Sequence, residues 1–424
     1  MTSGLGRRDF LKMLGATGAL ASLSSCGRGR PRVVVVGGGF GGATCARYVT
    51  MIDPGIEVVL VERSEKYVTC PMSNNVIGGL RTMDSITHSY DRLAAHPGIK
   101  LVHDTVGAID PGARTVKLAS GGTLSYDRLV LSPGIDFQWN AIAGYDEAAA
   151  SIMPHAWKAG AQTELLMRQL AAMEDGGLVV IAAPDNPYRC PPAPYERACM
   201  IAHHLQATGK ARSKVLILDA KDKFTKQALF EQGWKRFYSG MIEWVPGAKG
   251  GKVENVDPKA MTVHAAAGTF KASVANIVPP QTAGRIAVES GVANDDGWCQ
   301  VDPWTMESVV HKNIHVVGDS CFPGAMPKSG FSANSQAKNC AAAIVSLLRG
   351  EAATEPVFMN TCYSAVAPDY EISIAGAYRV AAGDIVAVLG SGGVSPLDAP
   401  DSERQAEYDY AAGWYRSVTD EMFG

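Results

Sequence analysis

The chain has 424 residues, of which 46% are apolar and 19% charged, so it can bury cores in two or three domains. A net charge of −3 argues against the basic surface that a nucleic-acid-binding protein presents, so we expect no nucleic-acid partner. Beyond the first residues, no apolar run is long enough to cross a membrane, so no transmembrane segment is expected.

The first residues carry an export signature. Arg7-Arg8-Asp9-Phe10-Leu11-Lys12 is typical of a twin-arginine signal, and a short apolar run from Met13 to Leu23 follows it. We therefore expect residues 1–30 to be a signal and the protein to be periplasmic. The segment before Cys26 also fits a lipoprotein cleavage box, so lipid attachment at Cys26 is an alternative to its loss with the leader.

A glycine-rich turn follows the first predicted strand. Val33–Val36 reads as a buried parallel strand, and a helix is expected from about Gly41 to Met51. Between them, three glycines lack the side chains that would keep the backbone from a pyrophosphate at the helix N-terminus. About 20 residues later, at the end of strand Glu57–Glu62, a carboxylate can accept ribose hydroxyls. The residues assigned to this dinucleotide site are Gly37, Gly39, Gly42, Glu62 and Arg63.

Two later strand ends identify the dinucleotide. A strand over Thr123–Ser132 ends at Pro133, which we assign to the same site. A buried strand over residues 313–319 ends in Gly-Asp, where FAD enzymes with two dinucleotide domains hold the ribityl chain with a carboxylate. Asp319 together with Glu62 therefore indicates FAD. The helix that follows, near Ser332 to Leu348, should point its positive N-terminus at the flavin pyrimidine.

The second nucleotide fold lacks a phosphate-binding turn. Strands are predicted at Gly177–Ile181 and Lys214–Asp219, but the segment between them begins Ala182–Pro192 and is rich in proline. Proline has no amide donor for a phosphate, and Asp185 would repel one. We therefore expect no NAD(P) here and a different electron partner.

These elements predict an α/β protein with two Rossmann-like dinucleotide-binding domains, the second inserted in the first, and a small α+β C-terminal domain. The FAD-binding domain is expected over residues 31–145 and 271–355. The NAD-domain-like unit without a nucleotide motif covers residues 146–270, and the C-terminal domain covers residues 356–424.

Three cysteine-containing segments carry a family resemblance. Tyr67–Asn74, Tyr188–Arg197 and Asn360–Ser364 together resemble the flavoprotein subunit of flavocytochrome c sulfide dehydrogenase, as do Met326–Ser329 and Ser332–Gln336. The resemblance extends over essentially the whole mature chain. The wider group includes the sulfide:quinone oxidoreductases.

The resemblance implies specific roles for the cysteines. Cys70 would be joined through sulfur to the 8-methyl carbon of FAD, unless it is an unmodified buried cysteine. Cys190 and Cys362 would form the redox-active disulfide beside the flavin; a purely structural bridge is the alternative.

Two charged residues also gain roles from the resemblance. Glu196 would accept a proton from sulfide or thiol, with an exposed carboxylate at a helix N-terminus as the alternative. Lys328 could offset the charge of reduced flavin, or be a solvated loop lysine. Cys45 and Cys340 are expected to be small buried hydrophobic residues.

The implied activity is the oxidation of hydrogen sulfide, with electrons passing from FAD to a c-type cytochrome. The chain has no C-x-x-C-H motif, so we expect the haem on a separate subunit in a heterodimer. A periplasm-facing sulfide:quinone oxidoreductase and a non-catalytic flavin electron carrier are the alternatives. No C-x-x-C motif is present, and no carboxylate or cysteine is expected at metal-ligand spacing from His203-His204. We therefore expect no metal site.

Overall fold

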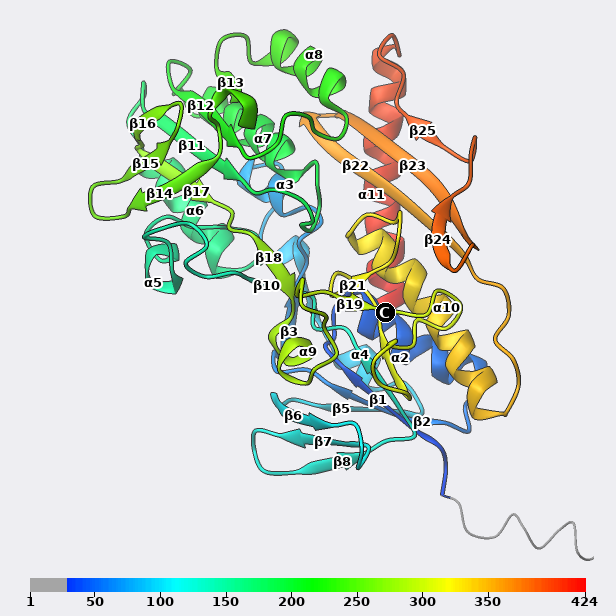
Figure 1. Ribbon diagram of the computed structural model, residues 1–424. Helices are drawn as coiled ribbons and strands as arrows, with labels where there is room; N and C mark the ends of the chain where they lie inside the picture. The colour runs from blue at the N-terminus through cyan, green and yellow to red at the C-terminus, as the bar shows by residue number, and fades with distance from the viewer. Residues whose placement is uncertain (1–28) are drawn as a thin grey trace, which may run out of the picture.

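The computed structural model describes residues 29–424, which form two parallel-sheet domains and a C-terminal antiparallel sheet (Figure 1). The expected twin-arginine motif and Cys26 lie outside these residues. The predicted fold class is confirmed, because each parallel sheet alternates with helices and the chain returns to the first sheet after completing the second.

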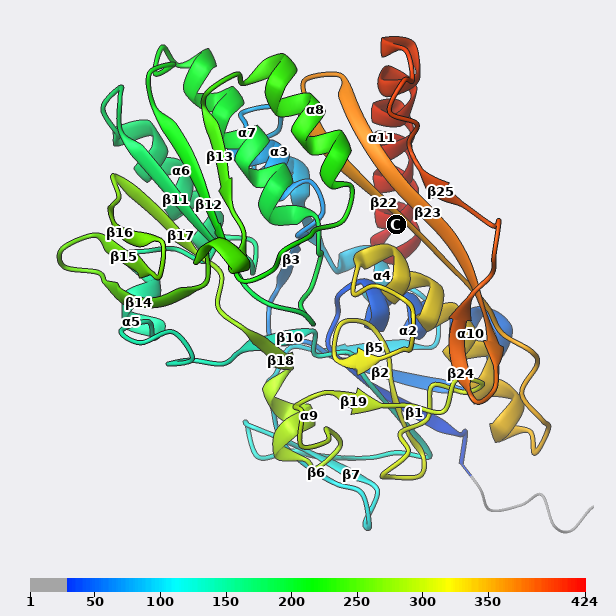
Figure 2. The same ribbon diagram turned by 45° about the horizontal axis from the view of Figure 1, so that its top comes forward.

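The first sheet is parallel and has the order β20-β9-β1-β2-β5. Its strands are β1 (Arg32–Val36), β2 (Glu57–Val61), β5 (Ile99–Val102), β9 (Arg128–Leu131) and β20 (Ile314–Val316). The valine run of β1 is buried, as expected for a central strand covered on both faces. Helices α2 (Phe40–Ile52) and α10 (Gly330–Leu348) pack against each other beside this sheet (Figure 2).

The strand predicted over Thr123–Ser132 is two strands. β8 (Thr123–Ser125) joins a hairpin sheet with β6 (Val106–Asp110) and β7 (Thr115–Leu118), whereas β9 joins the parallel sheet. The chain changes partners at Asp127, whose N–H donates to the carbonyl of Arg32 in β1. Periodicity alone does not reveal such a change, because both halves remain extended.

The second sheet has the order β13-β12-β11-β17 and is also parallel. Its strands are β11 (Leu178–Ala183), β12 (Lys214–Asp219), β13 (Ile242–Val245) and β17 (Val274–Ile277), with helices α6 (Ala161–Ala172), α7 (Ala193–Ala207) and α8 (Gln227–Phe237). A three-stranded antiparallel sheet of β14 (Val253–Asp257), β15 (Thr262–Ala265) and β16 (Gly268–Lys271) accompanies it. The antiparallel pair β10 (Ile135–Phe137) and β18 (Gln281–Ala283) joins the segments that lead into and out of this domain.

The C-terminal segment begins with a long hairpin of β22 (Val357–Ala367) and β23 (Tyr370–Ala381), which β24 (Asp384–Ala387) and β25 (Gly393–Val394) extend. Helix α11 (Asp401–Phe423), red in Figure 2, runs beside this hairpin. The Trp414 ring of α11 stacks on Phe40 and Phe331, with centroids 6.3 and 5.6 Å away. The C-terminal segment therefore packs directly against the FAD-binding domain.

Helix α11 also contacts the segment that carries Cys70. The Tyr415 hydroxyl hydrogen bonds to Thr69 at 2.8 Å and to His88 at 2.9 Å. No helix within residues 29–424 is long and apolar enough to cross a membrane. The shorter elements are β3 (Lys66–Val68), α3 (Ser73–Ile77), β4 (Thr87–Ser89), α4 (Asp91–Ala94), α5 (Glu147–Ala150), α9 (Arg285–Glu289), β19 (Cys299–Gln300) and β21 (Cys321–Phe322), with 3-10 turns at Asp84–Ile86 and Gly247–Lys249.

Candidate active site

The glycine turn between β1 and α2 has the shape of a phosphate cradle. Gly37 has φ +96°, a conformation that side chains disfavour, and Gly39 lies directly before α2. A Cβ atom on Gly42 would overlap the Gly37 carbonyl oxygen. The Gly38 N–H donates to Glu62 at 2.8 Å, which ties the predicted ribose-binding carboxylate to the turn. Backbone and acid therefore fit a dinucleotide bound at the start of α2.

Asp319 follows β20 and offers an unpaired acceptor. Its Oδ1 atom is buried and has no hydrogen-bond partner among residues 29–424, whereas Oδ2 lies 3.7 Å from Arg189. Burial raises the pKa of this carboxyl group, and Arg189 and Lys328 oppose that effect. An orphaned buried oxygen is costly, so this atom fits a hydroxyl donor such as the ribityl chain of FAD.

The other predicted cofactor residues lie in different surroundings. Pro133 lies against the glycine turn, whereas the Arg63 side chain is exposed. Lys328 is buried rather than solvated; its ammonium group donates to the Asp319 carbonyl at 2.9 Å and lies 3.7 Å from the centre of the Trp298 ring. The Lys328 carbonyl in turn accepts from the Cys190 N–H at 2.8 Å. The lysine thus links the Asp319 turn to the cysteine loop.

Cys190 and Cys362 lie side by side in the structure although they are 172 positions apart in the sequence. Cys190 lies in the proline-rich loop after β11 with φ +57°, a left-handed conformation that is unusual outside glycine. Cys362 lies in β22. Both are free thiols, and the Cys190 thiol hydrogen bonds to the Cys362 sulfur. The proline-rich loop, which lacks a phosphate-binding turn, thus supplies one half of a dithiol.

The two thiols are electrostatically unequal. The hydrogen bond from Cys190, aided by Lys226, lowers the pKa of Cys362 to about 7. The same hydrogen bond, followed by burial, raises the pKa of Cys190. The buried Lys226 ammonium donates to the Cys362 carbonyl at 2.9 Å and to Ser364 at 2.8 Å. Cys362 is therefore the thiolate of the reduced pair. Lys226 belongs to no motif that sequence reasoning identified.

One cavity of about 110 Å³ brings Cys70 together with this pair. The Cys70 sulfur is 3.4 Å from the Trp157 carbonyl oxygen. The N-terminal end of α10 also reaches the cavity through Ser329, Gly330 and Phe331. The helix end predicted to face the flavin and all three predicted functional cysteines thus surround a single space.

Two carboxyl groups line the same cavity. Glu196, in the first turn of α7, accepts hydrogen bonds from Asn74 at 3.1 Å and from the Ala365 N–H at 3.2 Å. Burial raises the pKa of Glu196 in spite of these bonds, so the alternative of an exposed carboxylate is wrong. The second is Glu371 in β23, which the sequence analysis missed. Its only signal is an acidic residue between Tyr370 and Ile372 at the start of a largely apolar strand.

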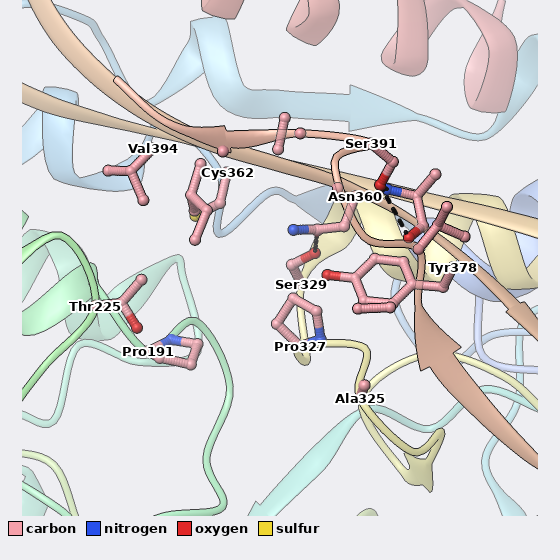
Figure 3. Close-up of a pocket in the computed structure, with 18 of the residues that line it drawn as sticks. Pro191, Thr225, Ala325, Pro327, Ser329, Asn360, Cys362, Tyr378, Ser391 and Val394 are labelled. Carbon is pink, nitrogen blue, oxygen red and sulfur yellow. Dashed lines mark hydrogen bonds between the residues drawn. The ribbon is translucent and has the colours of Figure 1, made fainter. Parts of the chain in front are cut away.

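A second cavity, of about 420 Å³, is also lined by the cysteine pair, but most of its other lining residues differ from those of the first (Figure 3). Cys362, Asn360 and Tyr378 project into it from the hairpin, and Pro191 and Thr225 lie opposite. Much of the remaining lining is small or apolar, from Ile374–Ala377 and Ala387–Val394. The pair is thus accessible to small molecules from this cavity as well as from the one that contains Cys70.

Cys45 and Cys340 are fully buried, as expected, between α2 and α10, where the two thiols hydrogen bond to each other. Among residues 29–424, no group of three or more His, Cys, Asp or Glu side chains is placed to hold a metal ion.

Three family models match successive parts of the chain. The model for the central part of the sulfide dehydrogenase [flavocytochrome c] flavoprotein chain matches residues 163–279. The model for the flavin-binding part of flavocytochrome c sulphide dehydrogenase matches residues 354–423, and that for pyridine nucleotide-disulphide oxidoreductases matches residues 31–164. Together they include the glycine turn and the segments that carry Cys70, Cys190 and Cys362.

Individual relatives agree with these matches. The chain is 60% identical over 48 residues to the sulfide dehydrogenase [flavocytochrome c] flavoprotein chain of Chlorobaculum thiosulfatiphilum, covering 100% of that sequence and 11% of this one. It is 23% identical to mitochondrial sulfide:quinone oxidoreductase of Mus musculus, over 68% of this chain and 65% of the mouse protein. The structure of sulfide:quinone oxidoreductase from Aquifex aeolicus superposes with a TM-score of 0.70 at 18% identity, covering 92% of each chain, which shows a shared fold.

Proposed function

Because the chain belongs to the family of flavocytochrome c sulfide dehydrogenase flavoprotein chains, we propose that it oxidises hydrogen sulfide with FAD and the Cys190–Cys362 pair. The observation that carries this proposal is the shared cavity: both cysteines line the space that Cys70 also reaches. A dithiol that served only to link two segments would not need to lie at such a space.

The unequal thiols indicate the direction of attack on their disulfide. HS⁻ forms a sulfur–sulfur bond with Cys190 while the Cys190–Cys362 bond breaks, and the electron pair of that bond remains on Cys362. This direction is favoured because the thiol of lower pKa, about 7 for Cys362, is the better leaving group. Lys226, next to Cys362, stabilises the thiolate that is released. FAD, when bound, supplies the two-electron acceptor for this thiolate.

Glu196 holds the proton that sulfide gives up. Its carboxyl group lines the cavity and is fixed by Asn74 and by the Ala365 N–H. Because burial raises its pKa, the group binds a proton more readily than an exposed glutamate does. It can therefore take the proton of the persulfide formed on Cys190, and the negative charge passes from the carboxylate to the outer sulfur.

The FAD is held in this proposal by a thioether at Cys70 in addition to the glycine turn. Support comes from the position of the Cys70 sulfur in the cavity and from the resemblance of Tyr67–Asn74 to the family motif. Acid precipitation of the wild type should leave the yellow colour in the pellet, and Cys70→Ser should release it to the supernatant. Release of colour from the wild type would contradict the covalent bond.

A c-type cytochrome subunit receives the electrons, and the complex works in the periplasm. The cytochrome is supported by the name of the matching family and by the lack of a haem attachment motif in this chain. The periplasmic location is supported by the twin-arginine motif Arg7-Arg8-Asp9-Phe10-Leu11-Lys12. A lipid attached at Cys26 would hold the protein at the membrane within the same compartment.

The acceptor distinguishes this function from quinone reduction and from passive electron carriage. Purified protein is mixed anaerobically with sulfide, and flavin absorbance is followed with either cytochrome c or a quinone analogue present. We expect sulfide to bleach the flavin and cytochrome c to restore its colour. Turnover with the quinone alone would indicate a sulfide:quinone oxidoreductase, and no bleaching would contradict both enzymatic functions.

A further inference from the structure

Glu371 is a buried carboxyl group that the chemistry described above does not use. It lies near the start of β23, lines the cavity of the cysteine pair and is 3% exposed. Its Oε2 atom is buried without a hydrogen-bond partner in the described part of the chain. An ionised carboxylate without donors is costly to bury, so the protonated acid is the favoured form here.

Charged groups from four segments act on Glu371. Burial raises its pKa well above the usual range, and Glu196 on α7 and Glu407 on α11 add to this effect, whereas Lys226 before α8 and Arg81 after α3 oppose it. In the hairpin register, Glu371 is opposite Ala365, whose N–H donates to Glu196 at 3.2 Å. Glu371 and the backbone N–H that holds Glu196 therefore lie at the same position of the β22–β23 pair.

Repeated sulfide oxidation needs a way to return Glu196 to its ionised form. Converting HS⁻ to zero-valent sulfur releases two electrons and one proton in each turnover. Glu196 accepts this proton and must lose it before it can accept the proton of the next turnover. Transfer to a neighbouring carboxyl group is the direct way to restore the anion inside a buried cavity.

We propose that Glu371 relays protons out of the cavity for Glu196, an inference that rests on the proposed sulfide oxidation. At the start of a turnover Glu371 is protonated and Glu196 is ionised. When Glu196 has taken a proton from sulfur, Glu371 gives its own proton to solvent on the α11 side and takes the proton from Glu196. Solvent is the acceptor rather than Glu407 of α11, because the Glu407 carboxylate is already held by Ser373 at 2.7 Å and by Arg404 at 3.1 Å. The number of protons is conserved, and Glu196 is again an anion.

The relay predicts a separation between the first turnover and later ones. In Glu371→Gln, anaerobic single-turnover reduction of the flavin by sulfide should stay close to the wild-type rate, because Glu196 still accepts the first proton. Steady-state kcat with cytochrome c should fall by about 10-fold or more, because Glu196 is no longer restored efficiently. Glu371→Asp should recover part of kcat, and the exposed Glu403→Gln on α11 should behave as wild type.

Infrared difference spectroscopy supplies a second measurement that does not depend on turnover. Wild type should show the carbonyl stretch of a protonated buried carboxyl group that changes when sulfide is added, and Glu371→Gln should lack it. Wild-type kcat in Glu371→Gln, or the absence of this band from the wild type, would overturn the relay. If Glu371→Gln does not fold, Glu371→Asp decides, because the band should shift in that variant if it belongs to residue 371, and an unshifted band would overturn the relay. A wild type that sulfide does not reduce at all would overturn the proposed function and the relay with it.

Discussion

The chemistry at the residue scale depends on side chains that motifs reveal to different degrees. Cys70, Cys190 and Cys362 lie in segments with family motifs, and the structure brings all three to one cavity. Lys226 and Glu371 lie in no motif, and each reaches the cysteine pair only through the packing of α8 and the hairpin against α7. Their roles could not be predicted because a lone lysine or glutamate has no local pattern that sets it apart from a surface residue.

Lys226 should control the reactivity of the reduced pair. Lys226→Met removes the positive charge beside Cys362, so the pKa of that thiol should rise above its present value of about 7. If it rises by one unit, the thiolate fraction at pH 7 falls roughly fivefold. The measurement is the alkylation rate of the reduced protein at pH 7. The exposed Lys223→Met is the control, and an unchanged rate in Lys226→Met would show that the ammonium does not act on Cys362.

At the scale of elements, the strands and helices around the cofactor site lie close to where the sequence predicts them. The observed α2 begins at Phe40 and α10 at Gly330, near the predicted starts. These elements are predictable because long apolar runs followed by glycine have few alternative structures. The division of Thr123–Ser132 into two strands was not predicted, since it depends on the distant partner β1.

The turn into α2 should tolerate no side chain at Gly42. In Gly42→Ala the new Cβ would overlap the Gly37 carbonyl oxygen, so the turn must open and its amide donors must move. We expect the purified variant to contain only a small fraction of the wild-type flavin, measured by absorbance. Gly413→Ala, in an open position of α11, is the control and should retain full flavin content. Full flavin content in Gly42→Ala would contradict the assignment of the turn.

His315 in β20 should make the fold sensitive to acid. It is fully buried; its Nδ1 donates to the Thr305 carbonyl at 2.8 Å, and burial lowers its pKa from 6.5 to about 4. As the pH falls, His315 therefore binds a proton in the unfolded chain before it does so in the folded one. The contribution of His315 to the free energy of unfolding is complete above pH 6.5 and is lost progressively toward about pH 4.

Replacement of His315 tests this loss. His315→Asn keeps an N–H donor but cannot ionise, so its Tm should fall less than that of wild type between about pH 7 and pH 5, by the equivalent of about 2 kcal/mol. His311→Asn, just before β20, is the control. An equal fall in Tm for His315→Asn and wild type would show that His315 does not contribute.

At the scale of the whole molecule, the presence of two nucleotide folds could be predicted, whereas the packing of α11 against the FAD-binding domain could not. Two nucleotide folds follow from alternating apolar strands and helical segments. The packing of α11 across the FAD-binding domain, through Trp414 and Tyr415, has no local signal in a helix of mixed composition. That packing matters because it closes the cavity: Trp414 from α11 and Cys362 from β22 line it together with Cys190 from the inserted domain.

The account as a whole depends on electrons passing from sulfide to FAD through the Cys190–Cys362 pair. The most direct test is rapid anaerobic mixing of sulfide with wild type and with Cys362→Ser of equal flavin content, followed at the flavin absorbance band. The wild-type flavin should bleach, and the flavin of Cys362→Ser should remain oxidised. Bleaching of Cys362→Ser at the wild-type rate would contradict the account, because sulfide would then reduce the flavin without the cysteine pair.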